Sequence, residues 1–265
     1  MSLTDDELLA VAEQAVEPVA EWLGQAGSEW SRQRLKPSGE EVTDADVEVE
    51  RRVSRALHDR TPDIPVMGEE SASSDGVSTA SRHWLLDPID GTANYANGDP
   101  FYAVSLALAA ENESVLGVIH APALGLRWSV GPETAHASAP SRARDLSKAT
   151  VGISGSSGGP VSVGAFLRAL HERTRRLRIR GAMSLDLAGV AEGWLDACVC
   201  VSPKPWDVAA GLALVRKREG TILGRGGHPF SWNSPLLVAG EESVARELVD
   251  LWESTPSASS FDARR

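Results

Sequence analysis

Helical periodicity dominates the first sixty residues of this chain. Apolar residues recur at three- and four-residue steps within residues 5–23, which predicts an amphipathic helix. A second stripe of this kind follows Thr43, and Asp46 stands where a capping box places its acidic residue. Between the two, residues 33–41 are polar and include Pro37 and Gly39, so we expect a loop there.

Strand-like runs fill the middle of the chain, and strands alternate with helices after it. Short apolar runs at residues 64–67 and 84–86 predict two strands, and three longer runs between residues 101 and 130 predict an antiparallel meander packed on the first helices. The later part predicts strands at residues 150–154, 175–180, 196–201 and 235–239, and helices at residues 161–170, 184–193, 206–216 and 241–252.

These elements predict an α+β or α/β fold. An antiparallel meander half, residues 1–140, would be followed by a mixed and partly parallel α/β half, residues 141–253. Residues 254–265 are polar, and we expect them to be a disordered tail.

Composition narrows the class of protein. The chain has 265 residues, of which 42% are hydrophobic, so it can bury a large core. Its net charge of -11 argues against nucleic acid as a partner. No apolar run approaches the ~20 residues of a membrane span, and the N-terminal segment lacks the basic and apolar regions of a signal peptide. The chain's two cysteines, Cys198 and Cys200, are poorly placed to bridge each other, which favours reduced thiols and a cytoplasmic location.

Candidate chemistry begins where the apolar run 84–86 ends. Asp87 and Asp90 stand three residues apart and would repel each other, and a divalent cation between them is the simplest remedy. Gly91 lets the backbone approach a ligand closely, and Thr92 adds a hydroxyl. A helix beginning here would also offer N–H groups to a phosphate. The pattern therefore indicates a site for phosphate esters, with an ordinary acidic turn as the alternative.

Three motifs in order along the chain resemble the inositol monophosphatase family. They are Gly68-Glu69-Glu70-Ser71, Asp87-Pro88-Ile89-Asp90-Gly91-Thr92 and Trp206-Asp207-Val208-Ala209-Ala210-Gly211. The resemblance extends from about Val42 to Gly240. It implies a layered αβαβα sandwich, a homodimer, and a lithium-sensitive hydrolase that uses two or three Mg²⁺ ions, or Mn²⁺.

The same resemblance assigns metal ligands and a catalytic set. One ion would be held by Glu69, Asp87 and the Ile89 carbonyl, and a second by Asp87, Asp90 and Asp207. A third and weaker ion would lie near Glu69 and Asp46, and the residues that activate water would be Asp46, Thr92 and Glu69. Asp46 and Asp207 also stand near predicted helix N-termini, where an acidic residue is common for helix stability alone.

The substrate-binding part departs from the family pattern. Gly181-Ala182-Met183-Ser184-Leu185-Asp186 resembles the family's Gly-Ser-Ala-Ala-Leu-Asp, and Met183 should narrow the pocket. Cys200 stands where the family usually has a Glu, and a thiol is a weak partner for a polyol. The expected substrate contacts are Asp90, Gly91, Thr92, Gly181, Ala182, Met183 and Cys200.

The leading interpretation is a Mg²⁺-dependent phosphomonoesterase acting on inositol monophosphate or a related small sugar or polyol phosphate. Histidinol-phosphate phosphatase and 3'(2'),5'-bisphosphate nucleotidase remain alternatives on the same metal core. A catalytically inactive regulatory homologue would be expected to lack one or more carboxylates, and all of them are present. An EF-hand calcium module needs its ligands within one 12-residue loop, whereas these span residues 46–207.

Overall fold

The computed structural model describes residues 3–36, 39, 41–71, 81–111, 113–135, 143–155 and 163–255. The chain divides into two compact units, Met1–Ala135 with Pro205–Leu214, and His136–Lys204 with Val215–Arg265. The sequence-based division placed everything after residue 140 together, whereas Pro205–Leu214, and Asp207 with it, belongs to the first unit. The expected tail lies almost entirely outside the described residues.

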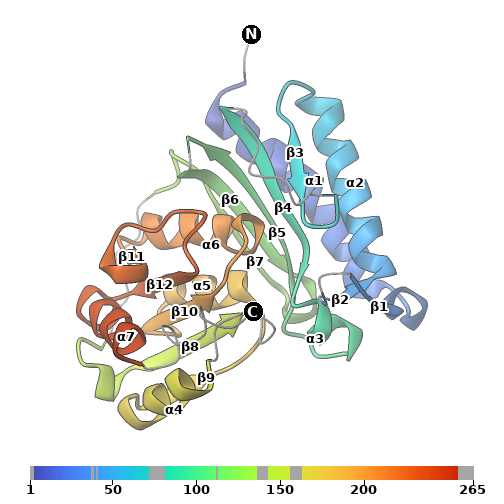
Figure 1. The fold of residues 1–265 in the computed structure, drawn as a ribbon. Helices are drawn as coiled ribbons and strands as arrows, with labels where there is room; N and C mark the ends of the chain where they lie inside the picture. Colours follow the sequence, from blue (N-terminus) through green and yellow to red (C-terminus); the bar gives the residue numbers. More distant parts are fainter. Residues whose placement is uncertain are drawn as a thin grey trace, which may run out of the picture. The chain divides into compact units, whose positions relative to one another are not determined.

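A five-stranded sheet forms the centre of the first unit, in the order β3-β4-β5-β6-β7. Strand β3 runs parallel to β4, and the other neighbours pair in the antiparallel way that the meander predicted. Helices α1 (Asp5–Gln25) and α2 (Asp44–Arg60) lie side by side against this sheet (Figure 1). The strands are Val66–Gly68, Arg82–Asp90, Ala103–Ala110, Glu113–Ala121 and Leu126–Val130.

Both helices begin and pack as their sequences predict. Helix α2 starts with a capping box in which Thr43 and Asp46 bond reciprocally, so two of the first N–H donors are satisfied. Its stripe Val49, Val53 and Leu57 is fully buried in one core cluster with α1 and the sheet. Burial of this apolar face stabilises the helix more than its propensity does.

The start of α6 (Pro205–Lys217) covers the other face of this sheet. A Cβ on Gly117 of β6 would lie 2.7 Å from the carbonyl oxygen of Ala210, so only glycine allows this approach. Because side chains alternate along a strand, Gly117 lies on the face opposite to Leu116 and Val118, which pack in the core with α1. This contact places the first turns of α6, with Asp207, over that opposite face.

Strand β4 extends further than expected. The sequence suggested that the strand ends at Asp87, but it continues to Asp90, with a shift of register against β5 between these two residues. Pro88 lies within this irregular stretch, where a missing N–H interrupts no regular ladder. Gly91 then adopts φ 91°, and the five-residue helix α3 (Thr92–Ala96) begins.

The predicted loop at residues 33–41 contains two short strands instead. Strands β1 (Gln33–Leu35) and β2 (Glu41–Thr43) pair antiparallel. All three residues of β1 are exposed, so the segment carries none of the apolar alternation by which a strand is predicted.

The second unit contains a mixed sheet in the order β11-β12-β10-β8-β9, which confirms the partly parallel prediction. Strand β8 is parallel to β9 and β10, whereas β12 is antiparallel to β10 and β11. The strands are β8 (Thr150–Gly155), β9 (Arg176–Arg178), β10 (Ala197–Val201), β11 (Thr221–Gly224) and β12 (Leu236–Gly240). Strand β11 was not predicted. Neither cysteine of β10 forms a disulfide.

Helices pack on both faces of this second sheet. Helices α4 (Gly164–Arg173) and α7 (Glu242–Ser254) share a core cluster with one face, and α5 (Met183–Glu192) contacts β8, β10 and β12. Short 3-10 helices are Ser28–Ser31, Pro122–Leu124, Leu146–Lys148 and Arg225–Gly227. None of the described helices combines the length and apolarity that a bilayer span requires.

Candidate active site

Asp87 is buried, with 3% of its surface exposed. Of the other predicted acidic site residues in the first unit, Asp46 is fully buried and Asp90 is 6% exposed. Along β4, Trp84 and Leu86 point into the core beneath α1 and α2. By the alternation of the strand, Asp87 points to the opposite face, which the start of α6 covers. Two segments far apart in the sequence therefore direct Asp87 and Asp207 to the same side of this sheet.

The electrostatics of Asp87 show a concentration of negative charge. Burial raises the pKa of Asp87 well above its ordinary value, and neighbouring carboxylates raise it further; they are Glu69, Asp90, Asp207 and Asp46. Among the described residues, Oδ1 of Asp87 has no hydrogen-bond partner. A buried carboxylate in this position takes up either a proton or a cation, because an unpaired buried charge is costly.

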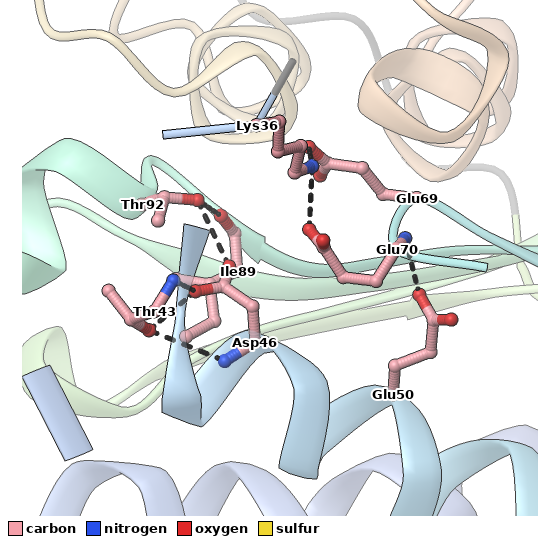
Figure 2. Close-up of polar contacts among 8 residues, drawn as sticks. All are labelled: Lys36, Thr43, Asp46, Glu50, Glu69, Glu70, Ile89 and Thr92. Atoms are coloured by element: carbon pink, nitrogen blue, oxygen red, sulfur yellow. Dashed lines mark hydrogen bonds and ion pairs between the residues drawn. The ribbon is translucent and has the colours of Figure 1, made fainter. Parts of the chain in front are cut away.

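Asp46 connects α2 to the segment after β4. Its Oδ2 accepts a hydrogen bond of 2.7 Å from the backbone N–H of Thr43, and its Oδ1 accepts one of 3.0 Å from Oγ1 of Thr92 (Figure 2). Thr92 Oγ1 also lies 3.0 Å from the carbonyl oxygen of Ile89. Burial raises the pKa of Asp46 to about 6, against the lowering effect of the bonds from Thr43. One carboxylate thus both caps its helix and contacts the predicted catalytic hydroxyl.

The two glutamates after β3 share one lysine. Nζ of Lys36 lies 2.7 Å from Oε1 of Glu69 and 2.7 Å from Oε1 of Glu70 (Figure 2). Burial disfavours the charged form of Lys36 and lowers its pKa. The two carboxylates favour the charged form more strongly, so the net effect is a raised pKa. Burial also raises the pKa of Glu70 to about 7, even though Lys36 acts in the other direction. Lys36 therefore supplies positive charge at the point where the metal ligand Glu69 is expected.

The donor set fits a hard divalent cation. Carboxylate and carbonyl oxygens are the ligands that Mg²⁺ prefers, and the unsatisfied oxygen of Asp87 lies among them. In the described part of the chain, no three His, Cys, Asp or Glu side chains already converge at ion-binding distance. Glu69 is turned toward Lys36 instead, so binding an ion requires this carboxylate to exchange partners.

The predicted site residues are divided between the two units. The first unit holds Asp46, Glu69, Asp87, Ile89, Asp90, Gly91, Thr92 and Asp207. In the second unit, Gly181 has φ 75° just before α5, and Ala182 and Met183 are buried where that helix begins. Cys200 is fully buried in β10, where it pairs with Ser154 and Leu237.

Two residues of the site were missed from the sequence. Lys36 lies in the polar segment taken for a loop, where a single lysine carries no signal. Glu50, which contacts the segment after β3, is four residues after Asp46 on the buried side of α2. Its spacing from Asp46, beside the apolar stripe, could have indicated that it points inward.

Comparisons with known proteins point to one family. The model of the inositol monophosphatase family matches residues 4–255. The chain is 36% identical over 204 residues to a Thermotoga maritima "Fructose-1,6-bisphosphatase/inositol-1-monophosphatase", which covers 72% of this chain and 75% of that protein. It is 34% identical over 232 residues to "Inositol-1-monophosphatase ImpA" of Mycolicibacterium smegmatis, with 83% of each covered.

Solved structures share the fold. A Thermotoga maritima IMPase superposes with a TM-score of 0.81 at 28% identity, over 94% of this chain and 98% of that one. An inositol monophosphatase from Anabaena gives a TM-score of 0.82 at 24% identity, over 96% and 98%. The predicted layered fold is therefore confirmed.

Proposed function

This chain belongs to the inositol monophosphatase family and is a phosphoric monoester hydrolase, and we propose that it hydrolyses inositol monophosphate or a related small sugar or polyol phosphate with the aid of Mg²⁺. One observation carries the metal dependence: buried Asp87 is surrounded by four carboxylates and keeps an oxygen that no described group satisfies. Neutralising such a cluster is what a divalent ion does.

The proposed ligands are oxygens from three segments: Glu69, Asp87, the Ile89 carbonyl, Asp90 and Asp207. Two or three ions fit the family resemblance, and Mn²⁺ has the same preference for oxygen. When bound, the ions lower the pKa of a water and offset the charge of the phosphate.

Asp46 and Thr92 are the proposed acid–base pair. Thr92 Oγ1 lies within hydrogen-bond distance of Asp46 Oδ1, so the hydroxyl orients a water and passes a proton to the carboxylate. Asp46 is suited to accept it at neutral pH, because burial raises its pKa to about 6. The backbone N–H groups of Gly91 and Thr92 are the proposed cradle for the phosphate. No covalent phosphoenzyme is part of this scheme.

The substrate is proposed from the relatives, whose names include inositol monophosphate and fructose 1,6-bisphosphate as substrates. Gly181, Ala182, Met183 and Cys200 are the proposed contacts of the second unit. Met183 and Cys200 depart from the family pattern, so histidinol phosphate and a 3'(2'),5'-bisphosphate nucleotide belong in the same test. A cytoplasmic, lithium-sensitive homodimer is proposed on the family resemblance, and light scattering after size exclusion tests the dimer.

The test is phosphate release from these four substrates, with glycerol 2-phosphate as a fifth, in Mg²⁺ with and without Li⁺. Asp90→Asn should lower turnover by at least ~100-fold while the fold survives, because it removes a metal ligand and no core contact. Asp59→Asn, at an exposed position of α2, is the matched control and should behave as wild type. Near-normal turnover in Asp90→Asn would contradict the site.

A further inference from the structure

Glu50 of α2 is a buried carboxylate that the proposed chemistry does not use. Only 6% of its surface is exposed. Its Oε2 accepts a hydrogen bond of 2.8 Å from the backbone N–H of Glu70, in the turn that follows β3 (Figure 2). A buried carboxylate that bonds to a backbone donor twenty residues away fixes the position of that backbone.

Gly68 shows that this contact is built into the fold. A Cβ at Gly68 would lie 2.2 Å from Oε2 of Glu50 and 2.3 Å from its carboxyl carbon. The backbone at Gly68 does not adopt the positive φ that by itself demands glycine. The Glu50 carboxylate therefore occupies the space that a side chain at position 68 would take, and any such side chain would displace it.

Glu69 stands between two backbone anchors. Its own N–H donates to the carbonyl oxygen of Leu86 on β4, at 3.1 Å. The next N–H, that of Glu70, donates to Glu50. With the peptide groups on both sides of its Cα fixed, the direction of the Cα–Cβ bond of Glu69 is fixed as well, and this sets where its side chain starts.

We propose that Glu50 is a positioning residue, which fixes the backbone of the Gly68–Glu70 turn and so keeps the Glu69 carboxylate within reach of the metal once it leaves Lys36. Helix α2 would thereby set both acidic segments, since Asp46 contacts Thr92 after β4 and Glu50 contacts Glu70 after β3. This inference rests on the proposed metal-dependent function. What it adds is that the hydrogen-bond acceptor, and not the charge of Glu50, performs the role.

The test compares Glu50→Ala, which removes the acceptor, with Glu50→Gln, which keeps an amide oxygen in its place. Glu48→Gln is the matched control, because Glu48 lies on the same helix but bonds to Arg51 and Arg52. The first readout is Mn²⁺ affinity by calorimetry without substrate. The second is hydrogen exchange of the Glu70 amide in the metal-free protein, with the Glu69 amide as internal reference.

We expect Glu50→Ala to weaken Mn²⁺ binding by about 10–100-fold and to speed exchange at Glu70 but not at Glu69. Glu50→Gln should stay within about threefold of wild type in both readouts, and Glu48→Gln should match wild type. Wild-type Mn²⁺ affinity in Glu50→Ala would overturn the inference. Equal loss in Glu50→Gln and Glu50→Ala would also overturn it, because charge would then be the cause.

Gly68→Ala provides a test that leaves Glu50 in place. Its added methyl displaces the carboxylate, so it should weaken Mn²⁺ binding as Glu50→Ala does, and the double variant should be no worse than Glu50→Ala alone. Additive losses would contradict the shared contact. A wild-type protein without Mn²⁺ binding would refute the proposed function instead, and the exchange at Glu70 would still decide the role of Glu50.

Discussion

Replacing Asp186 by Asn should make the protein more stable at neutral pH. Asp186 lies in the first turn of α5, close to the proposed substrate segment, and its side chain is fully buried. Its Oδ2 accepts a hydrogen bond of 2.6 Å from Oγ of Ser154, while Oδ1 has no hydrogen-bond partner among the described residues. The geometry is that of a structural acid, which holds β8 and α5 together at the cost of a buried charge.

The magnitude follows from the pKa of this carboxyl. Burial raises the pKa of Asp186 from 3.8 to about 6, although the bond from Ser154 and the charge of Arg180 oppose the change. The folded state therefore binds the proton more tightly, so stability is lost as pH rises from about 4 through about 6. At about 1.36 kcal/mol per pKa unit, the full loss is about 3 kcal/mol above that range. Asparagine keeps an acceptor for Ser154 and leaves one unpartnered buried atom, as aspartate does, so mainly the charge is removed.

Urea unfolding in EDTA between pH 4 and pH 8 measures the effect. The unfolding free energy of Asp186→Asn should equal that of wild type near pH 4 and exceed it by about 2–3 kcal/mol at pH 8. Ser154→Ala should do the reverse and lose more stability at pH 8, because its hydroxyl favours the ionised carboxylate. A difference that does not vary with pH would refute the reasoning. A 100-fold loss of turnover in Asp186→Asn would show that the carboxylate also serves the reaction and is not a structural acid alone.

Three further variants test the charges of the site and its pocket. Asp87→Asn should raise the melting temperature in EDTA by roughly 3–5 °C, because it removes a buried carboxylate that its neighbours repel. The same variant should no longer be stabilised by Mg²⁺. A wild-type rise in melting temperature with Mg²⁺ would contradict the role of Asp87 as a ligand. Lys36→Met should lower the metal-free melting temperature by roughly 5 °C and enlarge the Mg²⁺-induced rise, because Glu69 and Glu70 lose their shared cation. Cys200→Glu should raise kcat/KM for inositol 1-phosphate relative to glycerol 2-phosphate by about tenfold, which corresponds to one added hydrogen bond. The ratio of the two substrates is used because a loss of stability on burying a Glu affects both equally. An unchanged ratio would contradict the pocket assignment.

Local patterns predicted most of the elements because each depends on a few neighbouring residues. The capping box at Thr43 and Asp46 forms as expected, and so does the stripe behind it. The errors fall where tertiary contacts decide. Strand β1 is exposed and exists through its pairing with β2, and β4 continues through Pro88 because an irregular register accommodates the missing donor.

The acidic residues could be predicted from their motifs, but the contacts that arrange them could not. Asp46, Glu69 and Asp87 come from three segments, and nothing in their spacing states which side chain bonds to which backbone. Those links run through Thr92 to Asp46 and through the Glu70 N–H to Glu50, over 46 and 20 residues of sequence. The acceptors of both hydrogen bonds, Asp46 and Glu50, lie on the same face of α2, about one helical turn apart. On the proposed function, a single helix sets the relative positions of the two acidic segments, and a change on that helix should weaken metal binding without replacing a proposed ligand.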